Sequence, residues 1–248
     1  MRDIQILEQV LIKHGNAVTH KQLSEFLSTH SNINNKIHSL IRNGRLVNLK
    51  RGLYFITKIG SSGYTSISNY LIANLIGEGS FVSSEAALQF HGFFDQGVKK
   101  IRSISLKQYL SKKLEGTEYK YIKVDKKSFF GFDSKAVDGG IAAIALKERA
   151  LLDLLEYERT TVSVSIALEI LQNYYDDFDH ELLIKYLEKF SKVTAKTLGL
   201  FYDWLGKDST KIKKLLAKDK AVSRLTTMSE TYSKKWRLYY DSILENQL

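Results

Sequence analysis

The order of the elements expected in the first 58 residues constrains the fold more than any other feature of this sequence. Residues 4–12 place apolar side chains at helical spacing, and Gly15 follows as the expected C-cap. A second helix is expected after Thr19, because Thr19 and Gln22 match a capping box. A third is expected over residues 32–43. Its apolar stripe consists of Ile33, Ile37, Leu40 and Ile41.

Residues 45–56 then have the pattern of a β-hairpin with Lys50-Arg51-Gly52 at its tip. We expect its inward-facing side chains to be Leu46, Leu53 and Phe55. Two helices, a turn, a third helix and a basic hairpin follow one another in a winged helix-turn-helix, whose recognition helix enters the DNA major groove. The same order also fits a small helical domain with a solvated basic face, or a protein-interaction module.

The charge of this segment favours nucleic acid as its partner. The whole chain carries a net charge of +10, and residues 1–58 carry +6 of it, with 9 Lys and Arg against 3 Asp and Glu. No acidic residue occurs between Glu25 and Glu78. Because carboxylates repel the phosphate backbone, a surface that faces DNA is expected to avoid them.

The polar face of the third helix and the hairpin supply the candidate DNA contacts. Amide, imidazole and hydroxyl groups can read base edges. The base-reading candidates are Asn34, Asn35, His38 and Ser39. The phosphate or wing candidates are Lys36, Arg42, Arg45, Lys50 and Arg51. Protonation of His38 would strengthen a contact with phosphate.

The rest of the chain is expected to form a separate domain. Gly60-Ser61-Ser62-Gly63 is the one flexible-looking stretch, so the boundary is placed there, between residues 1–60 and 61–248. Residues 61–160 predict helices over 64–76, 83–91 and 147–157 and strands over 99–106, 119–124 and 141–145. Residues 161–248 show helical patterns alone. The predicted fold class is α+β, a winged helix-turn-helix followed by a mixed α/β and mainly helical C-terminal domain.

A second basic segment lies at residues 207–224. Its candidate surface residues are Lys211, Lys214 and Lys218. Runs of this kind are usually a solvated helix face. The alternative is a contact to DNA, to RNA or to an acidic protein surface.

Composition excludes several kinds of chemistry. The chain has no Cys, which excludes disulfides, thiolate metal sites and a cysteine nucleophile. The six His show no i, i+4 pair of the kind that binds zinc on a helix. No apolar run approaches the roughly 18 residues of a membrane span. We therefore expect no metal, no cofactor, no membrane partner and a cytoplasmic location.

The sequence matches two enzyme motifs in part, and neither is favoured. A nucleotidyltransferase needs an Asp-x-Asp pair soon after a Gly-Ser turn, but Asp177-Phe178-Asp179 lies far beyond Gly79-Ser80. We expect Asp179 to cap a helix instead. A nuclease motif, an acid followed by Glu-x-Lys, is matched by Asp95 with Glu118-Tyr119-Lys120. So short a pattern often arises by chance in a charged chain. The expectation is a protein that is not an enzyme.

Three segments, taken in order, carry a resemblance to a known family. The first is Gly44-Arg45-Leu46-Val47 with Lys50-Arg51-Gly52-Leu53-Tyr54. The second is Ser83-Ser84-Glu85-Ala86-Ala87-Leu88 with His91-Gly92. The third is Ala145-Leu146-Lys147-Glu148-Arg149-Ala150-Leu151-Leu152-Asp153-Leu154-Leu155. In their order and spacing, over roughly residues 1–160, they resemble the AbiEi antitoxins of type IV toxin–antitoxin systems. The third segment departs from the family's usual Pro-Glu-Lys-Ala, in a chain that has no Pro.

The resemblance implies a role in abortive infection, a form of phage resistance. It implies a repressor that binds inverted repeats in the promoter of its own operon. Its functional partner would be a nucleotidyltransferase-like toxin, with no stable complex expected between the two. The alternative is a stand-alone winged-helix regulator whose C-terminal domain senses another signal.

Overall fold

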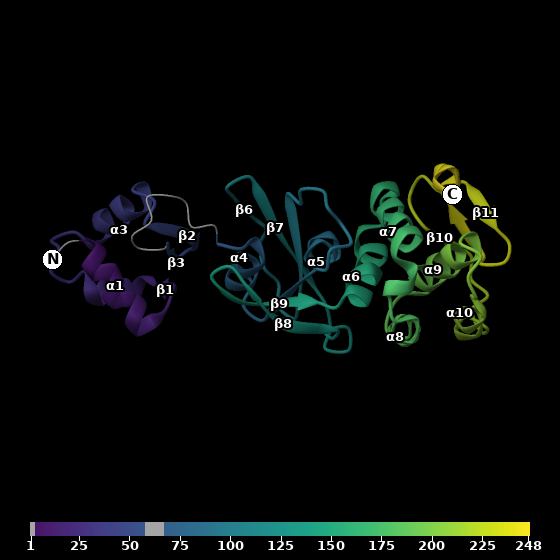
Figure 1. Cartoon of the computed structure of the whole chain (residues 1–248), viewed down its shortest axis with the longest axis horizontal. Coiled ribbons are helices and arrows are strands. Elements are labelled where there is room, and N and C mark those ends of the chain that lie inside the picture. Colours follow the sequence, from purple (N-terminus) through teal and green to yellow (C-terminus); the bar gives the residue numbers. More distant parts are fainter. Residues whose placement is uncertain (1–2, 58–66) are drawn as a thin grey trace. The chain divides into compact units, whose positions relative to one another are not determined.

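The computed structural model describes residues 3–57 and 67–248, which form a mixed α and β fold (Figure 1). Contacts divide the chain into two compact units, residues 1–79 with 134–143 and residues 80–133 with 144–248. The boundary expected at residues 60–63 lies outside the described residues. None of the helices in the described ranges is long and apolar enough to cross a membrane.

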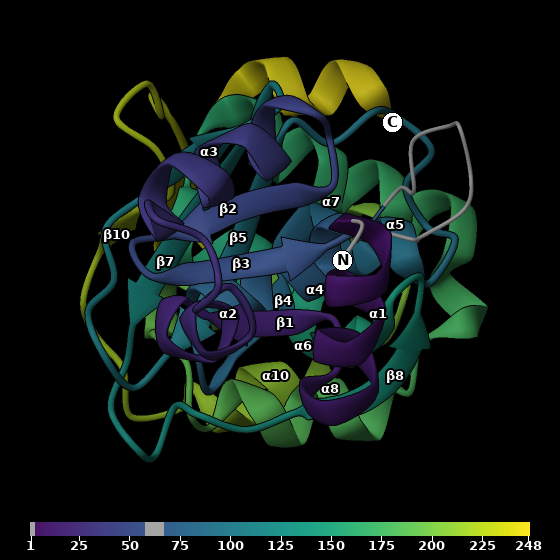
Figure 2. The same cartoon turned by 90° about the vertical axis from the view of Figure 1, so that its left-hand side faces the viewer.

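The first unit begins with three helices and a three-stranded antiparallel sheet of order β1-β3-β2, seen in Figure 2. These elements are α1 (Asp3–His14), β1 (Ala17–Thr19), α2 (His20–Phe26), α3 (Ile33–Arg42), β2 (Leu46–Lys50) and β3 (Leu53–Ile56). Helix α4 (Asn69–Ile76) follows. The three expected helices and the hairpin are confirmed. Strand β1 was not expected, because three residues are too few to show an alternating pattern.

Local signals explain where these helices begin and end. Gly15 has φ +77, and its N–H donates to the Leu11 carbonyl at 2.8 Å, which ends α1. Thr19 and Gln22 form the expected capping box at the start of α2. Asn32 caps α3, where its side chain accepts a hydrogen bond from the Asn35 N–H.

The hairpin register differs from the expectation. Leu46 pairs with Ile56, and both lie in the core that α1, α2 and α3 cover, together with Tyr54. Because side chains alternate along a strand, Leu53 and Phe55 lie on the opposite face. The prediction that these two join Leu46 in the core was therefore wrong. Phe55 is nevertheless buried, so both faces of this sheet are covered.

The second face of the sheet is covered within the same unit. A Cβ built on Gly139 would lie 3.3 Å from Leu71 of α4 and 3.4 Å from the Phe55 ring. Gly139 has φ +91, a conformation that favours glycine, and it makes the expected turn before residues 141–145. The turn therefore approaches the hairpin closely without a side chain in between.

The second unit contains most of a six-stranded mixed sheet of order β6-β7-β5-β4-β9-β8. Its strands are β4 (Ser80–Ser83), β5 (Lys100–Ser105), β6 (Lys112–Leu114), β7 (Thr117–Lys123), β8 (Phe132–Val137) and β9 (Gly140–Ala145). The helices are α5 (Ser84–Phe90), α6 (Lys147–Asp153), α7 (Thr161–Tyr174), α8 (His180–Leu187), α9 (Lys192–Trp204) and α10 (Thr210–Leu215). A π-helical turn, η1 (Leu154–Glu158), extends α6, and two 3-10 turns are η2 (Tyr175–Asp177) and η3 (Ser242–Gln247).

The prediction that residues 161–248 are purely helical was wrong. Strands β10 (Ser223–Arg224), β11 (Thr231–Ser233) and β12 (Leu238–Tyr240) form a second three-stranded sheet, in yellow in Figure 1. Tyr232 and Tyr239, which have helical spacing in the sequence, are cross-strand partners. Strands of two or three residues leave no alternating pattern, so the aromatic spacing was misleading.

The expectation that the terminal aromatics join the core holds for Trp236 and Tyr240, which are buried. The Trp236 ring lies directly on α9, where a Cβ at Gly199 would be only 2.3 Å from it. The Trp236 indole N–H donates to Asp203 at 2.7 Å. Gly199 thus provides the space that the ring needs, although glycine is unfavourable inside a helix.

Candidate nucleic-acid interface

Helix α3 presents an exposed polar face. Ile37 and Leu40 are buried against the core, which directs the opposite side of the helix to the surface. On that side Asn34, Asn35, His38 and Arg42 are exposed, whereas Ser39 is half-buried. Four of the predicted contacts therefore share one accessible, acid-free helix face.

Helix α2 holds the start of this face in place. The His20 imidazole Nε2 and the Asn34 Oδ1 are 2.9 Å apart, in a hydrogen bond between α2 and α3. His20 also lies beside the Tyr54 ring, with centroids 6.4 Å apart. Sequence reasoning did not single out His20, because nothing in the sequence indicates that it lies next to Asn34.

The acid-free stretch of the sequence is not acid-free in space. Asp3, in the first turn of α1, lies 2.6 Å from the Lys36 ammonium and 4.0 Å from the Arg45 guanidinium. Lys36 and Arg45 were both predicted to contact phosphate, and each has a carboxylate neighbour in this structure. The sequence does not indicate these ion pairs, because Asp3 is far from both residues along the chain.

The two basic residues of the hairpin have different surroundings. The Lys50 ammonium donates to the Ile76 carbonyl at 2.9 Å. That carbonyl belongs to the last turn of α4, where a cation is favoured by the helix dipole. Lys50 therefore anchors the hairpin to α4 in this structure, whereas Arg51 is exposed. Neither Arg51 nor Arg42 forms an ion pair with any residue in the described ranges.

The three candidate residues of the second basic segment have different neighbours. Lys211 pairs with Glu181 at the start of α8. Lys214 and Lys218 instead line a separate hollow of about 580 Å³, together with Lys192. One surface shared by Lys211, Lys214 and Lys218 stays a prediction, since all three are exposed and lie three and four residues apart.

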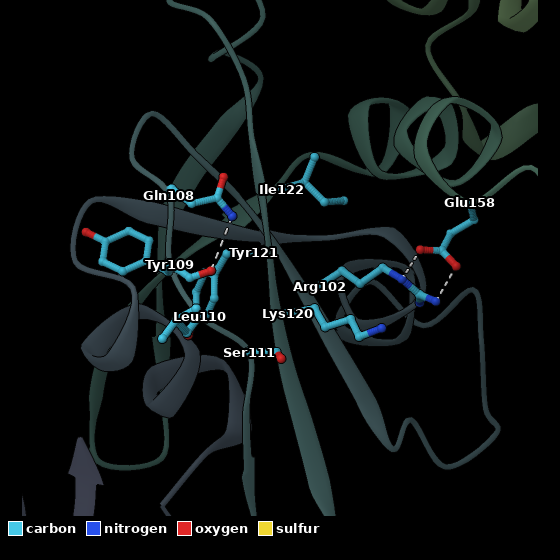
Figure 3. Close-up of a pocket in the computed structure, with 9 residues that line it drawn as sticks. All are labelled: Arg102, Gln108, Tyr109, Leu110, Ser111, Lys120, Tyr121, Ile122 and Glu158. Carbon is cyan, nitrogen blue, oxygen red and sulfur yellow. Dashed lines mark hydrogen bonds and ion pairs between the residues drawn. The ribbon is translucent and has the colours of Figure 1, made fainter. Parts of the chain in front are cut away.

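A hollow of about 320 Å³ lies over β5 and β7 (Figure 3). Its one deeply placed cation, Arg102, is 2.6 Å from Glu85 and also pairs with Glu158, as the dashed lines to Glu158 in the figure show. Lys120, from the neighbouring strand, lies 3.8 Å from Glu118. The cations of this hollow are thus matched by carboxylates within the protein.

Asp179 and His91 both have structural contacts. Asp179 caps α8, as expected, by accepting a hydrogen bond from the Leu182 N–H at 3.0 Å. The His91 Nε2 is 2.8 Å from the Ala145 carbonyl. Within the described residues, no group of three or more His, Asp or Glu side chains could hold a metal ion.

Comparisons with known proteins bear on the fold. No protein-family model and no curated protein matches this sequence. Among solved structures, the chain is similar to the crystal structure of the RV2827C protein from Mycobacterium tuberculosis, with a TM-score of 0.67. The two are 16% identical, over 98% of this chain and 93% of that chain. This likeness shows a shared fold along nearly the whole length.

Proposed function

We propose that residues 3–57 form a winged helix-turn-helix that binds double-stranded DNA. The observation that carries this proposal is the exposed, acid-free face of α3, where Asn34, Asn35, His38 and Arg42 lie together. Amide side chains pair with adenine edges, and arginine pairs with guanine or phosphate. The α1-β1-α2-α3-β2-β3 order supports α3 as the helix that enters the major groove.

In this proposal the basic residues make different contributions. Arg42 and Arg51 are free to contact phosphate or, for Arg51, the minor groove beside the site. Lys36 and Arg45 share Asp3, so bound phosphate would have to compete with that carboxylate. Lys50 supports the hairpin through α4 and is the weakest candidate for a direct contact.

We further propose that the protein is a type IV antitoxin that represses its own operon in the cytoplasm, as the resemblance to AbiEi proteins implies. Two of the three resembling segments contact each other in this structure. The Ser83 hydroxyl donates to Asp153 at 2.6 Å, and His91 bonds to Ala145 at 2.8 Å. These hydrogen bonds give the spacing of the segments a structural reason, which supports the resemblance without identifying the toxin partner.

DNA binding is tested by fluorescence anisotropy with the full chain. The probes are a duplex from its own promoter containing the inverted repeats and a scrambled duplex of equal length. We expect tighter binding to the promoter, and a roughly tenfold loss with Arg42→Ala. Lys13→Ala, which removes an exposed charge from α1, is the matched control and should change affinity by less than about twofold. Equal affinity for both duplexes would contradict an operator-binding role.

The antitoxin role needs a separate measurement. The full chain is co-expressed with the nucleotidyltransferase-like gene next to its own, and growth is followed. We expect wild-type protein to restore growth, and Arg42→Ala to restore it as well when expressed from a foreign promoter. A protein that binds its promoter but never restores growth would instead be the stand-alone regulator.

A further inference from the structure

A hollow in the second unit concentrates positive charge. It has a volume of about 580 Å³ and is lined by Lys192, Lys214, Leu215, Ala217, Lys218 and Asp219. The three lysines come from the first turn of α9 and from α10 with the turn after it. All three are exposed, and none forms an ion pair with a residue that the structure describes.

The single acid of the hollow is already neutralised. The Asp219 carboxylate lies 2.8 Å from the ammonium of Lys196, a side chain only 2% exposed. Its other oxygen accepts a hydrogen bond from the Ala221 N–H at 3.1 Å. The hydrogen bond from Lys196 holds the pKa of Asp219 below its usual value, so this carboxylate stays charged and paired. Lys192 adds a weaker attraction to the same carboxylate, so one negative charge faces Lys196 and the three lining lysines, which leaves an excess of positive charge in the hollow.

The position of Lys192 adds to this imbalance. It is the first residue of α9, where the helix dipole makes a cation unfavourable. An anion in the hollow would offset both that effect and the repulsion among the three lysines. Lysine binds phosphate as a point charge, and the volume lies within the range of small-molecule sites.

We propose that this hollow binds a small ligand carrying two or more phosphate groups, held by Lys192, Lys214 and Lys218. A single phosphate would leave part of the positive charge unmatched. A DNA duplex carries its phosphates on a convex surface, whereas this site is concave and includes the apolar side chains of Leu215 and Ala217. This site is independent of the DNA-binding face proposed for α3.

The test is isothermal titration calorimetry of the full chain with sodium tripolyphosphate at roughly 150 mM salt, where screening suppresses weak surface attraction. One variant combines Lys192→Gln, Lys214→Gln and Lys218→Gln. The control combines Lys213→Gln, Lys220→Gln and Lys234→Gln, three exposed lysines that do not line the hollow and remove the same charge. We expect the first variant to lose at least about tenfold in affinity and the control less than about twofold.

Other outcomes overturn the proposal. They include no binding by the wild type, or equal losses in the two variants, which would mean non-specific charge attraction. A titration with a random-sequence DNA duplex tests whether the hollow binds the phosphates of a nucleic acid instead. If the first variant loses duplex affinity but not tripolyphosphate affinity, the hollow is a nucleic-acid contact and the proposal is wrong. Arg42→Ala should leave tripolyphosphate binding unchanged, so this test does not depend on the function proposed for α3.

Discussion

The two compact units treat their polar side chains in opposite ways. Among the described residues of 3–57, every buried side chain is aliphatic or aromatic, and the charged groups are exposed or half-buried. The second unit buries Arg102, Arg149, Asp153 and Lys196, each with a partner. Buried charged side chains thus contribute to the internal structure of the second unit, whereas residues 3–57 have none. Substitutions at the two kinds of position should separate cleanly in their effects.

Arg149 is the clearest example of a buried charge with partners in the second unit. Its guanidinium is fully buried and bonds to Asp153 at 2.8 Å and to the Ser128 and Phe130 carbonyls at 2.8 and 3.2 Å. The rings of Phe130 and Phe190 lie over it at 4.5 and 4.9 Å. Burial raises the pKa of Asp153, against the opposing attraction of Arg149. A charge held in this way is buried inside the protein and is not accessible to an external ligand.

The largest effect is expected from Arg149→Ala. Removing one partner of a buried ion pair typically costs about 3–5 kcal/mol, because the other charge stays buried without compensation. The free energy of unfolding, measured by urea denaturation, should fall by that amount. Arg42→Ala, the surface counterpart, should change it by less than about 0.5 kcal/mol. Similar losses of unfolding free energy for the two variants would contradict this difference between the units.

A second large effect is expected at Asp241. Burial raises the pKa of this carboxyl, but hydrogen bonds from Thr161, Thr226 and Ser229 outweigh burial, and its pKa lies below the ordinary value. The three bonds are 2.6, 2.6 and 2.7 Å long. Asp241→Ala leaves these donors without their acceptor, so we expect a loss of about 1–3 kcal/mol in unfolding free energy.

The same carboxyl gives a pH dependence with a definite sign. Because its pKa is lower in the folded than in the unfolded protein, Asp241 stabilises the fold above the unfolded pKa of about 3.9. This contribution is lost as the pH falls from there through the folded pKa. Denaturation at a series of acidic pH values should show a smaller decline for Asp241→Ala than for the wild type. An identical decline would mean that other carboxyls account for the acid sensitivity.

The sequence predicts local structure well where one residue type sets a conformation. Gly15, Thr19 with Gln22, and Asp179 were all placed correctly, because caps depend on neighbours within four residues. The strands at 100–105, 117–123 and 140–145 also agree, because each is long enough to show its pattern.

Contacts between distant segments could not be predicted in this way. Phe55 was assigned to the wrong face of its strand, because the covering by Leu71 and Gly139 comes from later in the chain. In the candidate site, Asn34 and Arg42 were placed correctly on an exposed face. The pairing of Lys36 with Asp3, and of Lys50 with Ile76, depends on tertiary structure that spacing does not encode.

The two basic residues of the hairpin provide a smaller, matched test. Arg51→Ala should weaken DNA binding several-fold and reduce the slope of log affinity against log salt by about 1, since one phosphate contact is lost. Lys50→Ala should leave the slope unchanged and lower the free energy of unfolding by about 1 kcal/mol, the usual contribution of one hydrogen bond. Anisotropy at several salt concentrations and urea denaturation measure the two effects. A reversed pattern would show that Lys50, not Arg51, contacts the backbone.

The smallest effect is expected from Asp3→Asn, and it has the opposite sign. Asp3 shares its charge with Lys36 and Arg45, so the neutral amide should free both cations for phosphate and remove a repulsive carboxylate. We expect DNA affinity to rise about two- to threefold, which corresponds to the usual free energy of an exposed ion pair. The salt dependence of binding should also become steeper. Glu8→Gln, at an exposed position on the same helix, removes the same charge away from Lys36 and should have less effect. Weaker binding by Asp3→Asn would instead mean that Asp3 positions the two cations for DNA, and that the pairing is part of the interface.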